Sequence, residues 1–295
     1  MKLKYLLSGN VLEVYQYQRV IVGKGGAIRE VGKEGSYKEK NYQQTTMRRR
    51  EYVRRLALAN FGRGDLFVTL TFAENQTDVQ EANRAFRLFI MRLRRRYPGV
   101  QYLAVIEFQK RGAVHYHVLI NQSYIDQDAL AKIWGQGFVW INSISHVDNI
   151  GAYLVKYMSK EHSDSRLMGQ DGYLCSHGLK RWETFTEWEA GRADREKRHP
   201  YLKSARRALL ANLRAALGKV DHVYSSFYES DYVGCVLYVE YNLDRMGEGS
   251  EFVKDILDRL RFGNGKAQSE KCFQPCSELI KKVENRVELI SPLRL

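Results

Sequence analysis

The sequence has few of the features expected of a secreted, membrane-spanning or nucleotide-hydrolysing protein. Only four cysteines occur among 295 residues. That is too few for a disulfide framework in a chain of this size, so we expect a reducing, cytoplasmic location. The apolar stretch within residues 1–10 is short and is followed by charge, so we expect neither a signal peptide nor a membrane partner. No Gly-X4-Gly-Lys-Ser/Thr motif occurs, which argues against an attached helicase.

Positive charge, by contrast, is abundant and clustered. The chain has 47 lysines and arginines against 34 acidic residues, a net charge of +13. Arginines gather within residues 48–55 and again within residues 84–96. Many basic proteins bind nothing acidic, but clustering of this kind favours a polyanionic partner such as a nucleic acid.

Hydrophobic periodicity divides the chain into three regions. Residues 1–60 are interpreted as an N-terminal accessory segment that ends in a basic helix over 45–60. Residues 61–165 carry the clearest patterns, and residues 166–295 are interpreted as a C-terminal accessory region, an α/β subdomain. The elements expected in that last region are a helix at 194–217, a strand at 232–241 and a helix at 252–262.

The central region predicts an α+β fold. Alternation of apolar and polar residues predicts strands at 66–72, 102–108, 113–120 and 138–144. Helical spacing predicts helices at 77–96, 126–135 and 153–157. The order of strand, helix, strand, strand, helix, strand is the split βαβ order of ferredoxin-like domains, with a central antiparallel sheet. In that arrangement the first and third strands are central.

The third strand carries His115 and His117, which point to the same face of the sheet because side chains alternate along a strand. Matching the apolar faces of neighbouring strands predicts that Glu107 lies beside these histidines and faces the same way. The residues that share this expected open face are Gln109, Thr69 and Thr71. The pairing also requires an odd-length hairpin loop, which a turn at Gly112 can supply through a bulge.

Two imidazoles and a carboxylate on one face suit a divalent metal ion that keeps open coordination positions. Such an ion would polarise a phosphate oxygen. A lone His-X-His pair is more often ordinary packing. The independent placement of Glu107 beside His115 and His117 is what favours a metal site.

Tyr153 and Tyr157 lie four residues apart and therefore on one face of the predicted helix. Lys156 and Lys160 each follow one of them by three residues. A tyrosine hydroxyl, with an ordinary pKa of about 10, can attack a phosphate only when nearby positive charge favours the phenolate. The chain has 19 tyrosines, so packing is the alternative explanation for this pair taken alone.

Together these motifs resemble those of the HUH endonucleases, specifically the rolling-circle replication initiators of plasmids and small single-stranded DNA phages. The resemblance covers residues 66–161. The motifs occur in the family's order at 67–72, at Glu107 with 111–117, and at 153–160. One departure is the aromatic Tyr116, where the family more often has another hydrophobic residue.

The resemblance implies that His115, His117 and Glu107 bind Mg²⁺ or Mn²⁺. It also implies that a tyrosine attacks single-stranded DNA at the replication origin, stays on the 5′ phosphate and leaves a free 3′ hydroxyl for a DNA polymerase. Two-tyrosine members use the pair alternately. Tyr153 matches the first tyrosine of that pattern and Tyr157 also fits a one-tyrosine motif, so we assign both as catalytic, with Lys156 and Lys160 assisting.

DNA contacts are expected from Arg111, Thr69 and Thr71, which lie beside the metal-binding strand. Unwinding of the duplex would require a host helicase. A relaxase or a transposase of the same fold would use the same residues, so these alternatives stay open. A non-catalytic DNA-binding protein, such as a repressor, is a further alternative, and its binding to DNA would not depend on metal.

Overall fold

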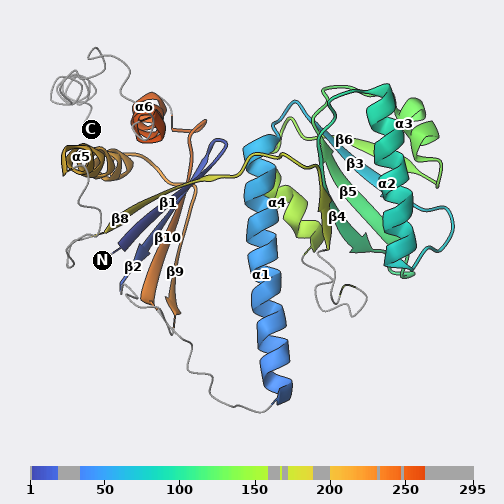
Figure 1. Ribbon diagram of the computed structural model, residues 1–295, viewed down its shortest axis with the longest axis horizontal. Coiled ribbons are helices and arrows are strands. Elements are labelled where there is room, and N and C mark those ends of the chain that lie inside the picture. The colour runs from blue at the N-terminus through green and yellow to red at the C-terminus, as the bar shows by residue number, and fades with distance from the viewer. Residues whose placement is uncertain are drawn as a thin grey trace, which may run out of the picture. The chain divides into compact units, whose positions relative to one another are not determined.

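The computed structural model describes residues 2–18, 34–158, 167, 172–188, 200–230, 233–246 and 249–262. These residues form an α+β structure that contains two antiparallel five-stranded sheets (Figure 1), so the predicted fold class is confirmed. The chain divides into two compact units. The first is Met1–Gly191 with Asp221–Gly247, and the second is Arg192–Val220 with Glu248–Leu295.

The sheet that carries the histidines has the strand order β6-β3-β5-β4-β7. Its strands are β6 (Val139–Ser143), β3 (Leu66–Thr71), β5 (Val114–Ile120), β4 (Tyr102–Phe108) and β7 (Tyr173–Cys175). The first and third predicted strands, β3 and β5, lie side by side in the interior of the sheet, as the split βαβ order requires. Sequence analysis missed the short strand β7, which pairs with the outer edge of β4.

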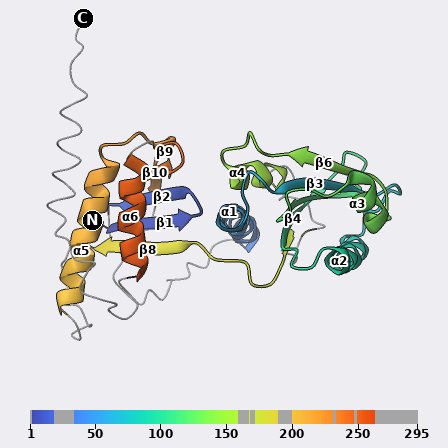
Figure 2. The same cartoon turned by 90° about the horizontal axis from the view of Figure 1, so that it is seen from above.

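Helices α2 (Val79–Arg96) and α3 (Gln127–Trp134) supply the core on one face of this sheet (Figure 2). Helix α2 begins one residue later than a capping box at Thr77 predicts, because the carboxylate of Asp78 accepts from the backbone amides of Gln80 and Glu81. Helix α3 begins at the predicted cap, Asp126, and ends at a left-handed glycine.

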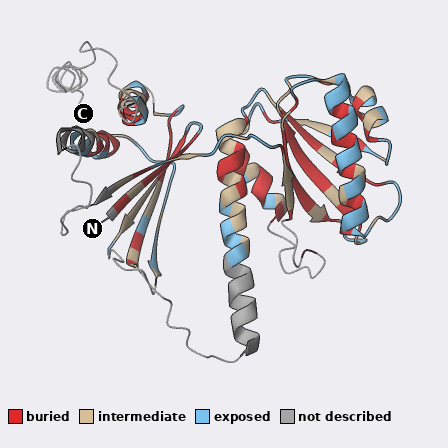
Figure 3. Cartoon of the chain, viewed as in Figure 1, coloured by how far each residue is buried: buried red, intermediate tan, exposed pale blue. Residues whose placement is uncertain are grey.

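The apolar faces of the strands match as predicted. The inward-facing residues of β3, β4 and β5 all belong to the core under α2 and α3. They are Leu66, Val68, Leu70, Tyr102, Ala104, Ile106, Phe108, Val114, Tyr116, Val118 and Ile120. Buried residues nevertheless line both faces of the sheet, as Figure 3 shows, so this core is only one of two.

The opposite face of the sheet is covered by α1 (Glu34–Asn60) and α4 (Ile150–Val155). Val53, Leu56 and Ala57 of α1 pack with strand residues Phe67 and Leu103 in a second core. The prediction of an open face is therefore wrong for this part of the sheet. The basic helix begins earlier than residue 45 and ends at Asn60, and its apolar residues seal that side of the sheet.

The second sheet has the order β8-β1-β2-β10-β9. Its strands are β8 (Glu183–Trp188), β1 (Lys2–Ser8), β2 (Val11–Tyr17), β10 (Gly234–Asn242) and β9 (Tyr224–Ser230). Strand β10 agrees with the strand predicted at 232–241, whereas the hairpin of β1 and β2 was not predicted. This sheet joins strands from residues 1–60 to strands from residues 166–295.

The second unit contains α5 (Pro200–Leu217) and α6 (Gly249–Phe262), which pack together. Both helices were predicted, although residues 194–199 of the first prediction lie outside the described residues. Among the helices that the structure describes, none combines the length and apolar character needed to span a bilayer.

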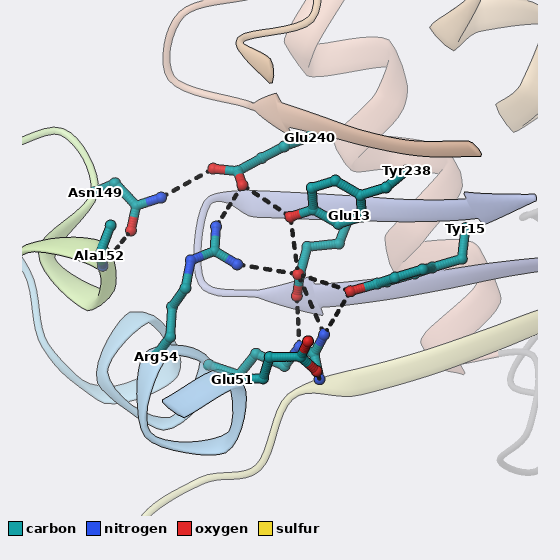
Figure 4. Close-up of polar contacts among 9 residues, drawn as sticks. Glu13, Tyr15, Glu51, Arg54, Asn149, Ala152, Tyr238 and Glu240 are labelled. Carbon is teal, nitrogen blue, oxygen red and sulfur yellow. Dashed lines mark hydrogen bonds and ion pairs between the residues drawn. The ribbon is translucent and has the colours of Figure 1, made fainter. Parts of the chain in front are cut away.

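A network of charged side chains links α1 to the second sheet (Figure 4). Glu13 on β2 accepts from Arg54 Nη1 at 3.0 Å and from Arg55 Nε at 2.6 Å. Arg54 also donates to Glu240 on β10. The second carboxylate oxygen of Glu240 accepts from the side-chain amide of Asn149, 2.9 Å away, at the start of α4. The network therefore reaches the helix that carries Tyr153.

Candidate metal and tyrosine site

The strand register brings the predicted metal ligands together. Glu107 on β4 lies directly opposite His115 on β5. On the other side of β5, Thr69 lies opposite His117 and Thr71 lies opposite His115. Because directly opposed residues share a sheet face, all five side chains emerge on the side of α1 and α4. The predicted position of Glu107 beside the histidines is confirmed.

The β4–β5 hairpin sets this register through a five-residue loop, 109–113, which has the odd length that the face matching requires. The amide of Gln109 donates to the carbonyl of Ala113 at 2.8 Å, and Gly112 has a φ of 88°, a value that favours glycine. Arg111 is exposed on this turn. Its guanidinium donates to the carbonyl of Phe72 at 2.8 Å and to Gln109 Oε1 at 2.9 Å.

Glu107, His115 and His117 each offer one donor atom, and the three atoms lie within 4.8 Å of one another. His117 Nε2 is 2.6 Å from Glu107 Oε2. His115 Nε2 is buried and has no hydrogen-bond partner among the described residues. A buried polar atom without a partner is unfavourable, and a divalent cation would satisfy it. This donor set therefore fits a metal ion, whose identity it leaves open between Mg²⁺ and Mn²⁺.

The surroundings of both histidines favour the neutral form that a metal ligand needs. Burial, the neighbouring His117 and Arg111 together lower the pKa of His115 to about 4, against the smaller opposing effect of Glu107. The Thr69 hydroxyl lies 3.2 Å from His117 Nδ1. Its oxygen can accept a proton from Nδ1 and so leave Nε2 free to bind the ion. Thr69, predicted as a DNA contact, is thus close enough to orient a metal ligand.

The tyrosine segment differs from a single helix over 153–157. Asn149 caps α4, its side chain accepting from the amide of Ala152 at 2.8 Å. The α-helix ends at Val155 and continues as a 3-10 helix, Lys156–Met158. Tyr153 therefore lies in α4 and Tyr157 in the tighter turn that follows.

Both tyrosines lie against the metal-ligand face. The ring of Tyr157 stacks on His117 with a centroid distance of 3.7 Å and an interplanar angle of 18°. The hydroxyl of Tyr157 donates to that of Tyr153 over 3.5 Å. Phe67 of β3 packs beneath both rings, with centroid distances of 5.0 Å to Tyr153 and 5.7 Å to Tyr157. Phe67 belongs to the first motif, and its role as a support for the tyrosines could not be read from sequence.

Lys156 lies over both phenol rings, its Nζ atom 3.9 Å from the centroid of Tyr153 and 4.7 Å from that of Tyr157. Burial together with the hydrogen bond and charge of Tyr157 raises the pKa of Tyr153, while Lys156 acts in the opposite direction. Tyr153 is therefore a phenol at neutral pH in the metal-free protein, and Lys156 alone does not make it a phenolate. Lys160 lies outside the described residues.

Comparison with known proteins agrees with this geometry. Residues 65–162 match the model of a family described as Replication-associated protein, of the ORF2 type. The match covers about a third of the chain and contains the His, Glu and Tyr residues of the site. No curated protein and no solved structure matches the chain. The family match supports a replication-associated protein of the Rep type and hence a role in DNA replication.

Proposed function

We propose that the chain initiates rolling-circle replication by nicking and rejoining single-stranded DNA at an origin. The observation that carries the proposal is the contact of two tyrosines with a metal-ligand cluster. Tyr157 stacks on His117, and its hydroxyl reaches that of Tyr153. Glu107 and His115 complete the cluster beside them. The match to a replication-associated family over the same residues supports the assignment.

The proposed reaction is a transesterification. The hydroxyl oxygen of one tyrosine forms a bond to the scissile phosphorus while the bond from phosphorus to the 3′ oxygen breaks. The attacking hydroxyl gives up its proton and the departing 3′ oxygen takes up a proton, so the proton balance of the step is zero. The products are a 5′-phosphotyrosine and a free 3′ hydroxyl, and the reverse reaction rejoins the strand.

Glu107, His115 and His117 would hold Mg²⁺ or Mn²⁺ through one donor atom each. A bound ion of this kind supplies Lewis-acid stabilisation of charge on the phosphate. Lys156, which is exposed, lies close enough to the phenol rings to neutralise charge that develops on the attacking oxygen. Thr69 would keep the His117 ring in its ligating orientation.

The tyrosines would act alternately, one cleaving while the other resolves the previous link. Their hydroxyls already lie within 3.5 Å of each other, so both can reach one phosphate position without a large movement. We assign Arg111 and Thr71 to DNA contacts beside the site. The free 3′ hydroxyl would serve a host polymerase, and a host helicase would unwind the duplex.

Covalent trapping tests the proposal. The full chain is mixed with Mn²⁺ and labelled single-stranded DNA fragments from its own replicon, and the products are separated on a denaturing gel. We expect an adduct at the 5′ side of the break that disappears with EDTA. Tyr124, which is 75% exposed and lies in the loop after β5, provides the matched control Tyr124→Phe, which should retain the adduct.

The variants Tyr153→Phe and Tyr157→Phe are each expected to reduce adduct formation, and the double variant to abolish it. Full adduct yield from the double variant would exclude both tyrosines as nucleophiles. Binding of DNA that is indifferent to metal and yields no adduct would instead indicate a non-catalytic DNA-binding protein.

A further inference from the structure

Two large aromatic side chains lie exposed beside the metal-ligand cluster. Phe138, just before β6, is 58% exposed, and Trp140 within β6 is 51% exposed. Their rings stack with a centroid distance of 6.2 Å and an interplanar angle of 25°. The indole Nε1 of Trp140 donates to Asn142 Oδ1 at 2.7 Å, which fixes the orientation of the ring. Trp134, by contrast, is 1% exposed within the core under α3.

The register of β6 puts this aromatic pair on the same face as the site. Val139 points into the core under α2 and α3, so its neighbours Phe138 and Trp140 point the other way. Trp140 lies opposite Thr69, and the amide of Thr71 donates to the carbonyl of Phe138. The pair therefore borders the row of side chains that contains the histidines.

Only β3 separates the aromatic pair from the histidine strand, and β3 contributes two small threonines at this point. Trp140, Thr69 and His117 follow one another across three adjacent strands. With neighbouring strands about 4.8 Å apart, the pair lies roughly 10 Å from the histidines. Stacked nucleotides rise about 3.4 Å each, so a strand held at the metal cluster reaches the pair within about three nucleotides.

We infer that Phe138 and Trp140 form a stacking platform for the bases of single-stranded DNA that flank the scissile phosphate. The inference rests on the proposed function, because it assigns the same strand to both sites. Burial of a stacked aromatic pair on the site face would otherwise be expected, since exposed phenyl and indole rings carry a hydrophobic cost. Nucleobases suit this surface because each has an apolar π-face, and stacking on aromatic side chains tolerates any sequence.

Equilibrium binding in EDTA tests the platform separately from the chemistry. The full chain is titrated into fluorescent (dT)20 and into an abasic oligonucleotide of the same length and charge. We expect (dT)20 to bind at least about tenfold more tightly than the abasic strand. The double variant Phe138→Ala with Trp140→Ala should lose most of that preference, Trp140→Tyr should restore part of it, and Tyr124→Ala should leave it unchanged.

An unchanged preference for (dT)20 in the double variant would overturn the platform while leaving the proposed nicking activity intact. Failure of the unsubstituted chain to bind either oligonucleotide would count against the proposed function itself and against the platform with it. Ultraviolet cross-linking of the unsubstituted chain to (dT)20 gives a second readout that needs no variant. Cross-linked peptides containing residues 138–140 would support the platform, and cross-links confined to other segments would refute it.

Discussion

Substitution of Glu13 by glutamine probes the charged network between α1 and the second sheet. The Glu13 side chain is 1% exposed and pairs with Arg54 and Arg55. Tyr238 donates to the same carboxylate at 3.0 Å. Loss of one partner from a buried ion pair costs about 3–5 kcal/mol, because the remaining charge stays buried without compensation. Arg54 retains Glu240, so we place the loss at about 3 kcal/mol, the lower end of that range.

The assay is urea unfolding of the full chain followed by circular dichroism. Glu51→Gln is the matched control, because Glu51 contacts the same Arg55 at 3.5 Å but its side chain is 58% exposed. An exposed pair of this kind contributes about 0.3–0.5 kcal/mol. If Glu13→Gln destabilised the protein no more than Glu51→Gln does, the reasoning about burial would be refuted.

The pH dependence of the same variant follows from the direction of the pKa shift. Burial raises the pKa of Glu13, but the hydrogen bond and charge of Arg55 and the charge of Arg54 outweigh it, so the pKa lies below its ordinary value of 4.5. Stability from this carboxylate is therefore complete above about pH 4.5 and is lost as the pH falls through the lower folded-state pKa. The difference between Glu13→Gln and the unsubstituted chain should shrink in acid, which unfolding curves at a series of pH values would measure.

Two further predictions concern packing and metal. Gly151→Ala should destabilise the protein by about 1–3 kcal/mol, because its Cβ would lie 2.4 Å from the backbone oxygen of Arg54 where α4 meets α1; thermal unfolding should show no comparable loss for Gly62→Ala, which meets nothing within 4 Å. Mn²⁺ should raise the unfolding temperature of the chain, since an ion that binds only the folded state stabilises it, and Glu107→Gln should weaken this effect; an equal rise in the variant would contradict the assigned ligands.

The metal-ligand face could be predicted because its determinants are local. Alternation along each strand separates the two faces, and apolar residues on one face leave Glu107 and the histidines on the other. The odd-length loop at 109–113 follows from the same register. The catalytic roles of Tyr153 and Tyr157 stay a prediction, although the structure brings both rings to His117 or to each other.

Several elements could not be predicted because their partners are distant in sequence. Strands β1 and β2 form a sheet only with β8 and β10, some 170 residues or more away along the chain. The apolar residues of α1 gave no sign that they cover the histidine face, because helical periodicity identifies an apolar stripe without identifying its partner.

Period-two alternation fixes side-chain direction within each strand, so the α+β class and the shared face of Glu107, His115 and His117 could be read before any coordinates were known. Three features of the site required the folded chain: the cover that α1 gives to part of that face, the tighter helical turn after Val155, and the stacking of Tyr157 on His117. These contacts arise from close packing between segments that share no local pattern, and no single stretch of sequence encodes them.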